Sequence, residues 1–283
     1  MNLSIDLYSG RTNPAWALPA SFSGLVFDLL ADLGFVRNLF GASRVTNLGY
    51  RGLNIVIPPD LAVRNNIPAT FIIPFNDPDL HQQLFREIIA LCRLIGFAGA
   101  EEMSRIAEVI LKLIQGILKR RVVPTPAPGG KSGCDYEMLT FDPAPWNDPN
   151  FILTNNCYAY ATNKRDKYPS KPQPGLGSGK IFDKITGPDV AAAAKRDGAH
   201  DLNDCFADSE KPRMLVALVI WPGEDYHWYR KHPDCWGHKP GSTAARNYDN
   251  SNKTISNPET CDRGPYTEFT GYFLIPKSQK VAA

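Results

Sequence analysis

The sequence predicts an α+β fold in two parts, and three observations carry this prediction. The first half combines strand-like alternation with long amphipathic helical patterns. The second half places a short helix ahead of several strands, an order typical of α+β domains. Between them, VVPTPAPGGKSG is rich in proline and glycine, as linkers are. We therefore expect an accessory α+β domain over residues 1–121, a linker over 122–133 and a second domain over 134–283.

The first half predicts two strands and three helices. LSIDLYSG and GYRGLNIVIP alternate like strands, and SFSGLVFDLLADLG is typical of a helix that starts at a serine and ends at Gly34. Residues 80–96 and 101–121 carry apolar side chains at helical spacing, which favours core packing over a cofactor site. Cys92 lies on the apolar face of the first of these helices, so we expect it in the core.

Composition and charge predict a soluble globular protein. The chain has 283 residues, a net charge of +2 and 43% hydrophobic residues. Acids and bases are mixed, which excludes nucleic acid and an anionic membrane as the main partner. The stretch MNLSIDLYSG lacks a basic region followed by an apolar run, so no secretory signal is expected. These features predict a cytoplasmic location, with export lacking an N-terminal signal as the alternative.

The second half predicts a helix and a set of antiparallel strands. GPDVAAAAKRDG has Pro188 at its start and Gly198 after its end, as helices do. Strands are expected in RMLVALVIWP, DYHWYRK, CWGHKPG and YTEFTGYFLIP. Together these elements predict an α+β domain in which a helix precedes antiparallel strands.

The stretch NNCYAYATN, residues 155–163, places Cys157 where a helix could start. Unpaired backbone N–H groups and the helix dipole favour a thiolate at that position, and thiolate is the nucleophilic form of cysteine. Asn155 or Asn156 could cap the helix and supply a donor for an oxyanion. The pattern therefore predicts a nucleophile at Cys157, with a buried structural cysteine as the alternative.

Histidines in DYHWYRKHPDCWGH provide a candidate base for this cysteine. If the two strands pair through a loop over residues 231–234, Arg230 faces Cys235 and His227 faces His238. Two imidazoles would then lie side by side, one as base and the other as its orienting partner. Asn247 and Asp249 are alternatives for the orienting role, although an aspartate in a turn more often binds backbone. His232 and Asp234 would lie solvated in the loop.

CYAYA followed by a histidine strand resembles the papain-like cysteine hydrolases, and the histidine in third place resembles their NlpC/P60 branch. The resemblance covers the last 130 residues or so. It implies a thiol-dependent peptidase or amidase that acts on a peptide or amide substrate without a cofactor or metal. Cys157, His227, His238, Asn156 and Asp249 would form its site.

Two other readings remain open. Cys235 and His238 have a spacing found in zinc sites, with His227 and His232 nearby, although no second cysteine pair accompanies them. The aromatic residues of the second half could instead form a non-enzymatic surface for peptide or glycan. Six cysteines would allow disulfides, but a chain of this length does not need them, and the expected compartment is reducing.

Overall fold

A computed structural model describes residues 1–33, 48–64, 67–75, 78–119 and 132–283. Helices and antiparallel sheets are both present, which confirms the α+β class. The chain divides into two compact units, each of which gathers separate segments. The first contains Met1–Leu7, Asn13–Val45 and Gly49–Arg121, and the second contains Tyr8–Thr12, Thr46–Leu48 and Val122–Ala283. The expected linker falls almost wholly within residues 120–131, outside the described residues.

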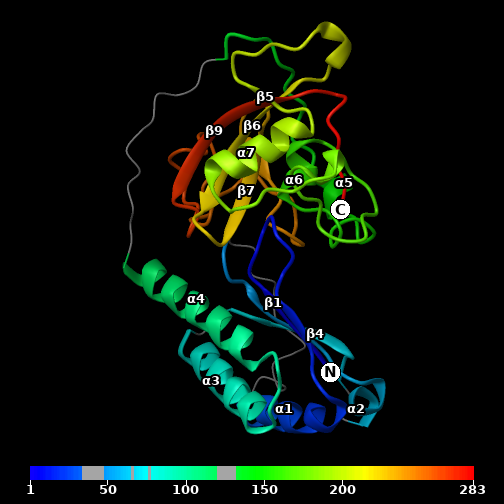
Figure 1. Ribbon diagram of the computed structural model, residues 1–283, viewed down its shortest axis with the longest axis vertical. Coiled ribbons are helices and arrows are strands. Elements are labelled where there is room, and N and C mark those ends of the chain that lie inside the picture. Colours follow the sequence, from blue (N-terminus) through cyan, green and yellow to red (C-terminus); the bar gives the residue numbers. More distant parts are fainter. Residues whose placement is uncertain (34–47, 65–66, 76–77, 120–131) are drawn as a thin grey trace. The chain divides into compact units, whose positions relative to one another are not determined.

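The first unit is an antiparallel four-stranded sheet with helices; its helices and strands β1 and β4 are labelled in Figure 1. Its strand order is β2-β1-β3-β4. The strands are β1 (Asn2–Asp6), β2 (Ala15–Ala17), β3 (Gly52–Val56) and β4 (Thr70–Pro74). The helices are α1 (Ala20–Asp32), α2 (Pro59–Arg64), α3 (Pro78–Leu94) and α4 (Ala100–Lys119).

The first unit follows most of the elements predicted for it and differs from the prediction at a few points. Cys92 is fully buried, as expected, and its thiol lies 3.8 Å from the sulfur of Met103 on α4. Helix α1 starts after Pro19 and has no side-chain cap, so the expected serine cap is wrong. Gly34, its expected end, lies outside the described residues. The sequence reading missed β2 and β4.

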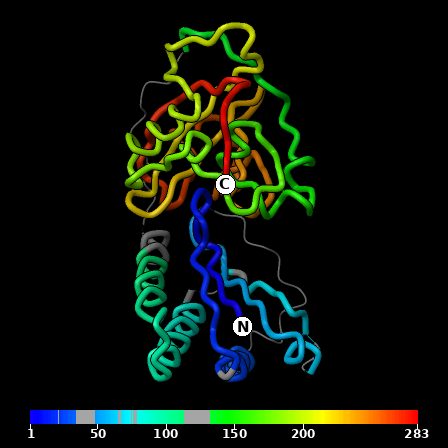
Figure 2. Tube along the Cα trace, turned by 45° about the vertical axis from the view of Figure 1, so that its right-hand side comes forward, coloured from blue at the N-terminus to red at the C-terminus, as the bar shows by residue number. Residues whose placement is uncertain are grey.

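The second unit is an antiparallel five-stranded sheet in the order β5-β9-β6-β7-β8. Its strands are β5 (His200–Asp201), β6 (Met214–Trp221), β7 (Asp225–Lys231), β8 (Trp236–His238) and β9 (Glu268–Ile275). Its α-helices are α5 (Ala144–Asn147), α6 (Cys157–Ala161) and α7 (Gly187–Arg196). Short 3-10 helices, η2 and η3, span Leu176–Ser178 and Asp208–Glu210. Figure 2 follows the long irregular segments that accompany these elements, in green and yellow.

Both faces of this sheet are covered, and the alternation along β6 shows how. Val216, Leu218 and Ile220 point into a cluster that includes residues of α6 and α7, which lie against the sheet (Figure 1). Leu215 and Val219 point into a second cluster with loop residues. A central strand covered on both faces is a continuous apolar run, as RMLVALVIWP is.

The predicted pairing of β7 with β8 is wrong in register. Tyr229 faces His238 and Arg230 faces Gly237, because the loop between the strands is 232–235 rather than 231–234. The pairing is displaced by two residues, and side chains alternate with a period of two. His227 and His238 therefore still share one face of the sheet.

Candidate functional site

Helix α6 begins at Cys157, as the sequence predicted, and Asn156 is its cap. The Asn156 Oδ1 atom accepts hydrogen bonds from the backbone N–H groups of Tyr158 at 3.1 Å and Ala159 at 3.2 Å. Its Nδ2 atom donates to the carbonyls of Gly10 and Pro172, both at 2.8 Å. The backbone N–H groups of Tyr158 and Ala159 and the Asn156 amide are therefore already hydrogen-bonded within the protein, whereas an oxyanion would need unoccupied donors.

The environment of Cys157 favours the neutral thiol. Its side chain is fully buried, and the thiol donates to the Tyr226 carbonyl over 4.0 Å. Burial, and secondly the negative charge of Asp225, raises the pKa of Cys157 from 9.0 to about 12. A nucleophilic cysteine requires the opposite shift. The structure thus places the candidate nucleophile in a setting typical of a core cysteine.

The two histidines of the candidate site are joined directly. His227 Nε2 and His238 Nδ1 lie 2.8 Å apart, and both side chains are fully buried. Burial, together with the charge of Arg246, lowers the pKa of His238 well below its usual range, so this imidazole is neutral. The two imidazoles are therefore neighbours, as the sequence suggested, although they are diagonal rather than opposed.

Arg246 and Tyr248 both contact the outer nitrogen of His238. This Nε2 atom lies 3.0 Å from Arg246 Nε, which only donates, and 3.0 Å from the Tyr248 carbonyl, which only accepts. On the other side of the pair, His227 Nδ1 lies 3.0 Å from the Ser9 hydroxyl. A continuous series of polar contacts therefore links Arg246 and Tyr248 through both imidazoles to Ser9.

Ser9 comes from a segment that the sequence reading assigned to a separate domain. Tyr8–Thr12 belongs to the second unit, and Ser9 is fully buried there. Its hydroxyl lies 2.9 Å from the Tyr266 hydroxyl and 3.1 Å from the Tyr226 carbonyl. The position beside His227 Nδ1 is thus filled by a residue of the protein itself.

The carboxylate of Asp225 anchors this segment. It accepts hydrogen bonds from the backbone N–H groups of Ser9 at 2.6 Å, Gly10 at 3.2 Å and Arg11 at 2.9 Å. The hydroxyls of Ser9 and Tyr266 also donate to it. A Cβ on Gly10 would lie 2.5 Å from the ring of Tyr226, so only glycine fits there. A fully buried carboxylate is tolerated because its oxygens are bound by these donors.

The alternatives for the orienting residue take other roles. Asp249 accepts from the backbone N–H groups of Ser251, Lys253 and Asp262, which is the turn role expected of an aspartate. Asn247 Nδ2 lies 3.7 Å from the sulfur of Cys235.

His232, expected to be solvated, is fully buried, so that expectation is wrong. Its Nε2 lies 2.8 Å from the Tyr160 hydroxyl, and burial lowers its pKa to about 4. Asp234 is exposed in the hairpin loop, as expected. Within the described part of the chain, no group of His, Cys, Asp and Glu side chains is arranged to hold a metal.

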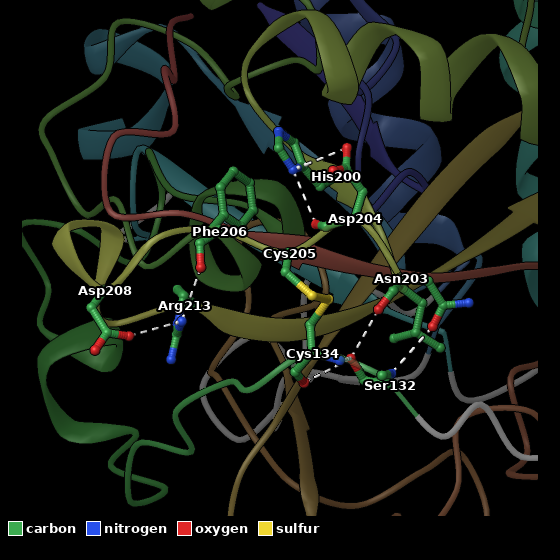
Figure 3. The surroundings of a disulfide bond; sticks show 11 residues. Ser132, Cys134, His200, Asn203, Asp204, Cys205, Phe206, Asp208 and Arg213 are labelled. Atoms are coloured by element: carbon green, nitrogen blue, oxygen red, sulfur yellow. Dashed lines mark hydrogen bonds and ion pairs between the residues drawn. A yellow bond between two sulfur atoms is a disulfide. The ribbon is translucent and has the colours of Figure 1, made fainter.

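A disulfide joins Cys134 to Cys205 in the second unit (Figure 3). Their Cα atoms are 5.2 Å apart, and 71 positions separate them in the sequence. Backbone around it is held as well: Ser132 Oγ donates to the Leu202 carbonyl at 2.9 Å, and the Asn203 side chain accepts from Gly133 at 3.2 Å. This bond differs from the expectation that the cysteines remain reduced.

Sequence reasoning missed Ser9, Asp225 and Tyr266 as members of this network. No local sequence pattern ties Asp225 to Ser9, which lies 216 positions earlier. The glycine after Ser9 was the available signal, because glycine often marks a close approach of backbone.

The fold and its centre define an α+β protein in which a cysteine, two histidines and a carboxylate form a buried hydrogen-bond network. The chain belongs to the family of insoluble matrix shell protein 1 of Ruditapes philippinarum. The two are 44% identical over 142 residues, which cover 50% of this chain and 93% of that relative. No family model and no solved structure matches the chain.

This relationship corrects the functional prediction. A relative named as an insoluble matrix shell protein contradicts the prediction of a thiol-dependent peptidase or amidase. It likewise contradicts the predicted cytoplasmic location. The papain-like resemblance itself stays a prediction. Among the described residues, no helix has the length and apolar character needed to span a bilayer.

Proposed function

We propose that this chain is a structural component of an insoluble extracellular matrix, built to stay folded rather than to turn over a substrate. The observation that carries the proposal is its 44% identity to insoluble matrix shell protein 1 across 93% of that relative. A matrix protein needs a fold that persists outside the cell without renewal. The second unit has features suited to that requirement.

The Cys134–Cys205 disulfide supports an extracellular setting. Disulfides form and persist in oxidising compartments, and are rare in the cytosol. Both cysteines lie in segments of the second unit with little regular structure, where a covalent link limits the freedom of the chain.

The buried polar network supports a structural role for the residues first considered catalytic. The Cys157 thiol is fully buried with a raised pKa, and Ser9 occupies the position beside His227. A satisfied network of this kind specifies one packing arrangement and makes local opening costly. We infer that these side chains stabilise the second unit.

Fractionation of the source tissue tests the proposal. Antibodies raised against the purified chain would be applied to cytosol, to salt and detergent extracts, and to the residue that resists both. We expect the chain in the resistant extracellular residue, with a cytosolic enzyme as the marker for contamination. Mass spectrometry without reduction should also recover the Cys134 and Cys205 peptides linked. Recovery of the chain only from cytosol, with both thiols free, would refute the proposal.

A further inference from the structure

A cavity of about 410 Å³ in the second unit lies apart from the buried histidine network. Arg230 of β7, Trp146 of α5, and Asn163 and Arg165 after α6 contribute polar groups to its lining. Leu139 and Pro145 add apolar surface. The cavity therefore combines cationic and apolar groups.

The guanidinium of Arg230 is held firmly at this cavity. Only 3% of the residue is exposed, and Nη1 donates to the Tyr160 carbonyl at 2.9 Å and to Asn163 Oδ1 at 2.8 Å. The group also lies over the Tyr160 ring, with Cζ 4.4 Å from the ring centroid. A guanidinium fixed in this way loses little further freedom when it binds a ligand.

One edge of that guanidinium is unused. Nε is buried without a partner, and neither Nε nor Nη2 hydrogen-bonds any residue within the described ranges. Because Nε has almost no accessible surface, Nη2 is the unused group that can donate to a ligand carboxylate. No described carboxylate forms an ion pair with Arg230. Burial of a cation without a counter-charge is costly, and burial lowers the pKa of Arg230.

Other groups around the cavity fit the same ligand chemistry. Arg165 brings a second positive charge, while Asp142 brings one negative charge. The Asp142 carboxylate is engaged in accepting from the backbone N–H of Ala144 at 3.0 Å. The Trp146 indole N–H has no acceptor in the described part of the chain, so it is available as a donor. Two positive charges, one engaged negative charge and an available N–H donor make an anion the favoured ligand of this cavity.

We propose that this cavity is a binding site for an organic carboxylate, which accepts a hydrogen bond from Nη2 of Arg230. The apolar part of the ligand would lie against Leu139, Pro145 and Trp146. The site is independent of the matrix role proposed above, since it rests on the geometry of the cavity alone.

Titration of the full-length protein with sodium acetate and sodium benzoate, at ionic strength held constant with sodium chloride, tests the proposal. The reporters are the Trp146 indole N–H and the Arg230 Nε–H in ¹H–¹⁵N spectra. The spectrum of Trp146→Phe assigns the indole signal. We expect saturable shifts of both signals with a Kd on the order of 1 mM, and tighter binding of benzoate because of its apolar ring.

Two variants with the same change in net charge separate the site from general electrostatics. Asn163→Asp places a carboxylate next to Arg230 Nη1, and Asn163 is exposed with φ 55°, which aspartate tolerates. We expect it to weaken benzoate binding about tenfold. Arg196→Gln, on exposed helix α7 surface, should leave binding unchanged.

The proposal is overturned by any of three results. These are the absence of saturable shifts up to about 100 mM benzoate, equal binding by the native protein and Asn163→Asp, and a chloride titration that reproduces the same shifts. Arg230→Lys, which keeps the charge but removes the fork, should lose binding if it folds. The Asn163→Asp result decides the question if it does not.

Discussion

Removal of the Cys134–Cys205 disulfide should destabilise the second unit by a predictable amount. The link closes a loop of 71 positions. Without this link the unfolded chain gains conformational entropy, which lowers the free energy of unfolding by about 4 kcal/mol at 25 °C. Residual structure in the unfolded chain reduces this value, so we expect Cys134→Ser/Cys205→Ser to lose about 2–4 kcal/mol.

Urea denaturation followed by tryptophan fluorescence measures this loss. Trp146, Trp221, Trp228 and Trp236 lie in the second unit and Trp16 in the first, so the signal reports mainly on the second unit. A reductant should shift the native curve to that of the double variant and leave the variant's own curve unchanged. This comparison separates the covalent link from the side-chain change.

A loss below about 0.5 kcal/mol would refute the reasoning, because it would mean that the link does not restrict the unfolded chain. The same conclusion would follow if reductant destabilised the double variant as much as the native protein.

Three further predictions concern the buried network. Asp225→Asn should lower the free energy of unfolding, measured in urea, by about 2–4 kcal/mol, because an amide N–H₂ would face backbone N–H donors. The exposed control Asp234→Asn should change it by less than about 0.5 kcal/mol, and equal effects of the two substitutions would contradict the anchoring role of Asp225. Asn156→Ala should lower the free energy of unfolding by about 2–3 kcal/mol, since it removes the α6 cap and two buried hydrogen-bond donors. The exposed control Asn150→Ala should be near neutral, and an equal loss of stability in the two variants would rule out the capping role. Cys157 should resist iodoacetamide at pH 8 in the native protein and react in urea, as measured by mass spectrometry, and rapid labelling of the native protein would be incompatible with a buried thiol. Because the pKa of Cys157 is raised from 9.0 to about 12, its contribution to folding stability is present below about pH 9 and is lost as the pH rises towards 12.

Periodicity and local chemistry predicted much of the fold. The helical stripes of α3 and α4 and the apolar run of β6 are strong signals, since each involves many residues in one pattern. The start of α6 at Cys157 was predictable because an asparagine before a helix is a recognisable cap. The short strands β2 and β4 were missed, and β2 has only three residues, too few to show alternation.

The sequence predicted several residues of the candidate site but not their reactivity. The pairing of His227 with His238 survived an error in register because a displacement of two keeps both on one face. Cys157 is buried in the apolar cluster between the sheet and the helices, and Ser9, which lies beside His227, comes from a distant part of the sequence. Reactivity depends on what covers a side chain, and that is a property of the tertiary structure.

The position of Tyr8–Thr12 within the second unit has a consequence for synthesis. Asp225, the anchor of these residues, is translated more than two hundred positions after them. The second unit therefore cannot finish folding while most of the chain is still being made. A recombinant fragment that begins after the linker would also leave Asp225 without its backbone donors. Work on the isolated second half should therefore supply the N-terminal segment, either by fusion or as a peptide added in trans.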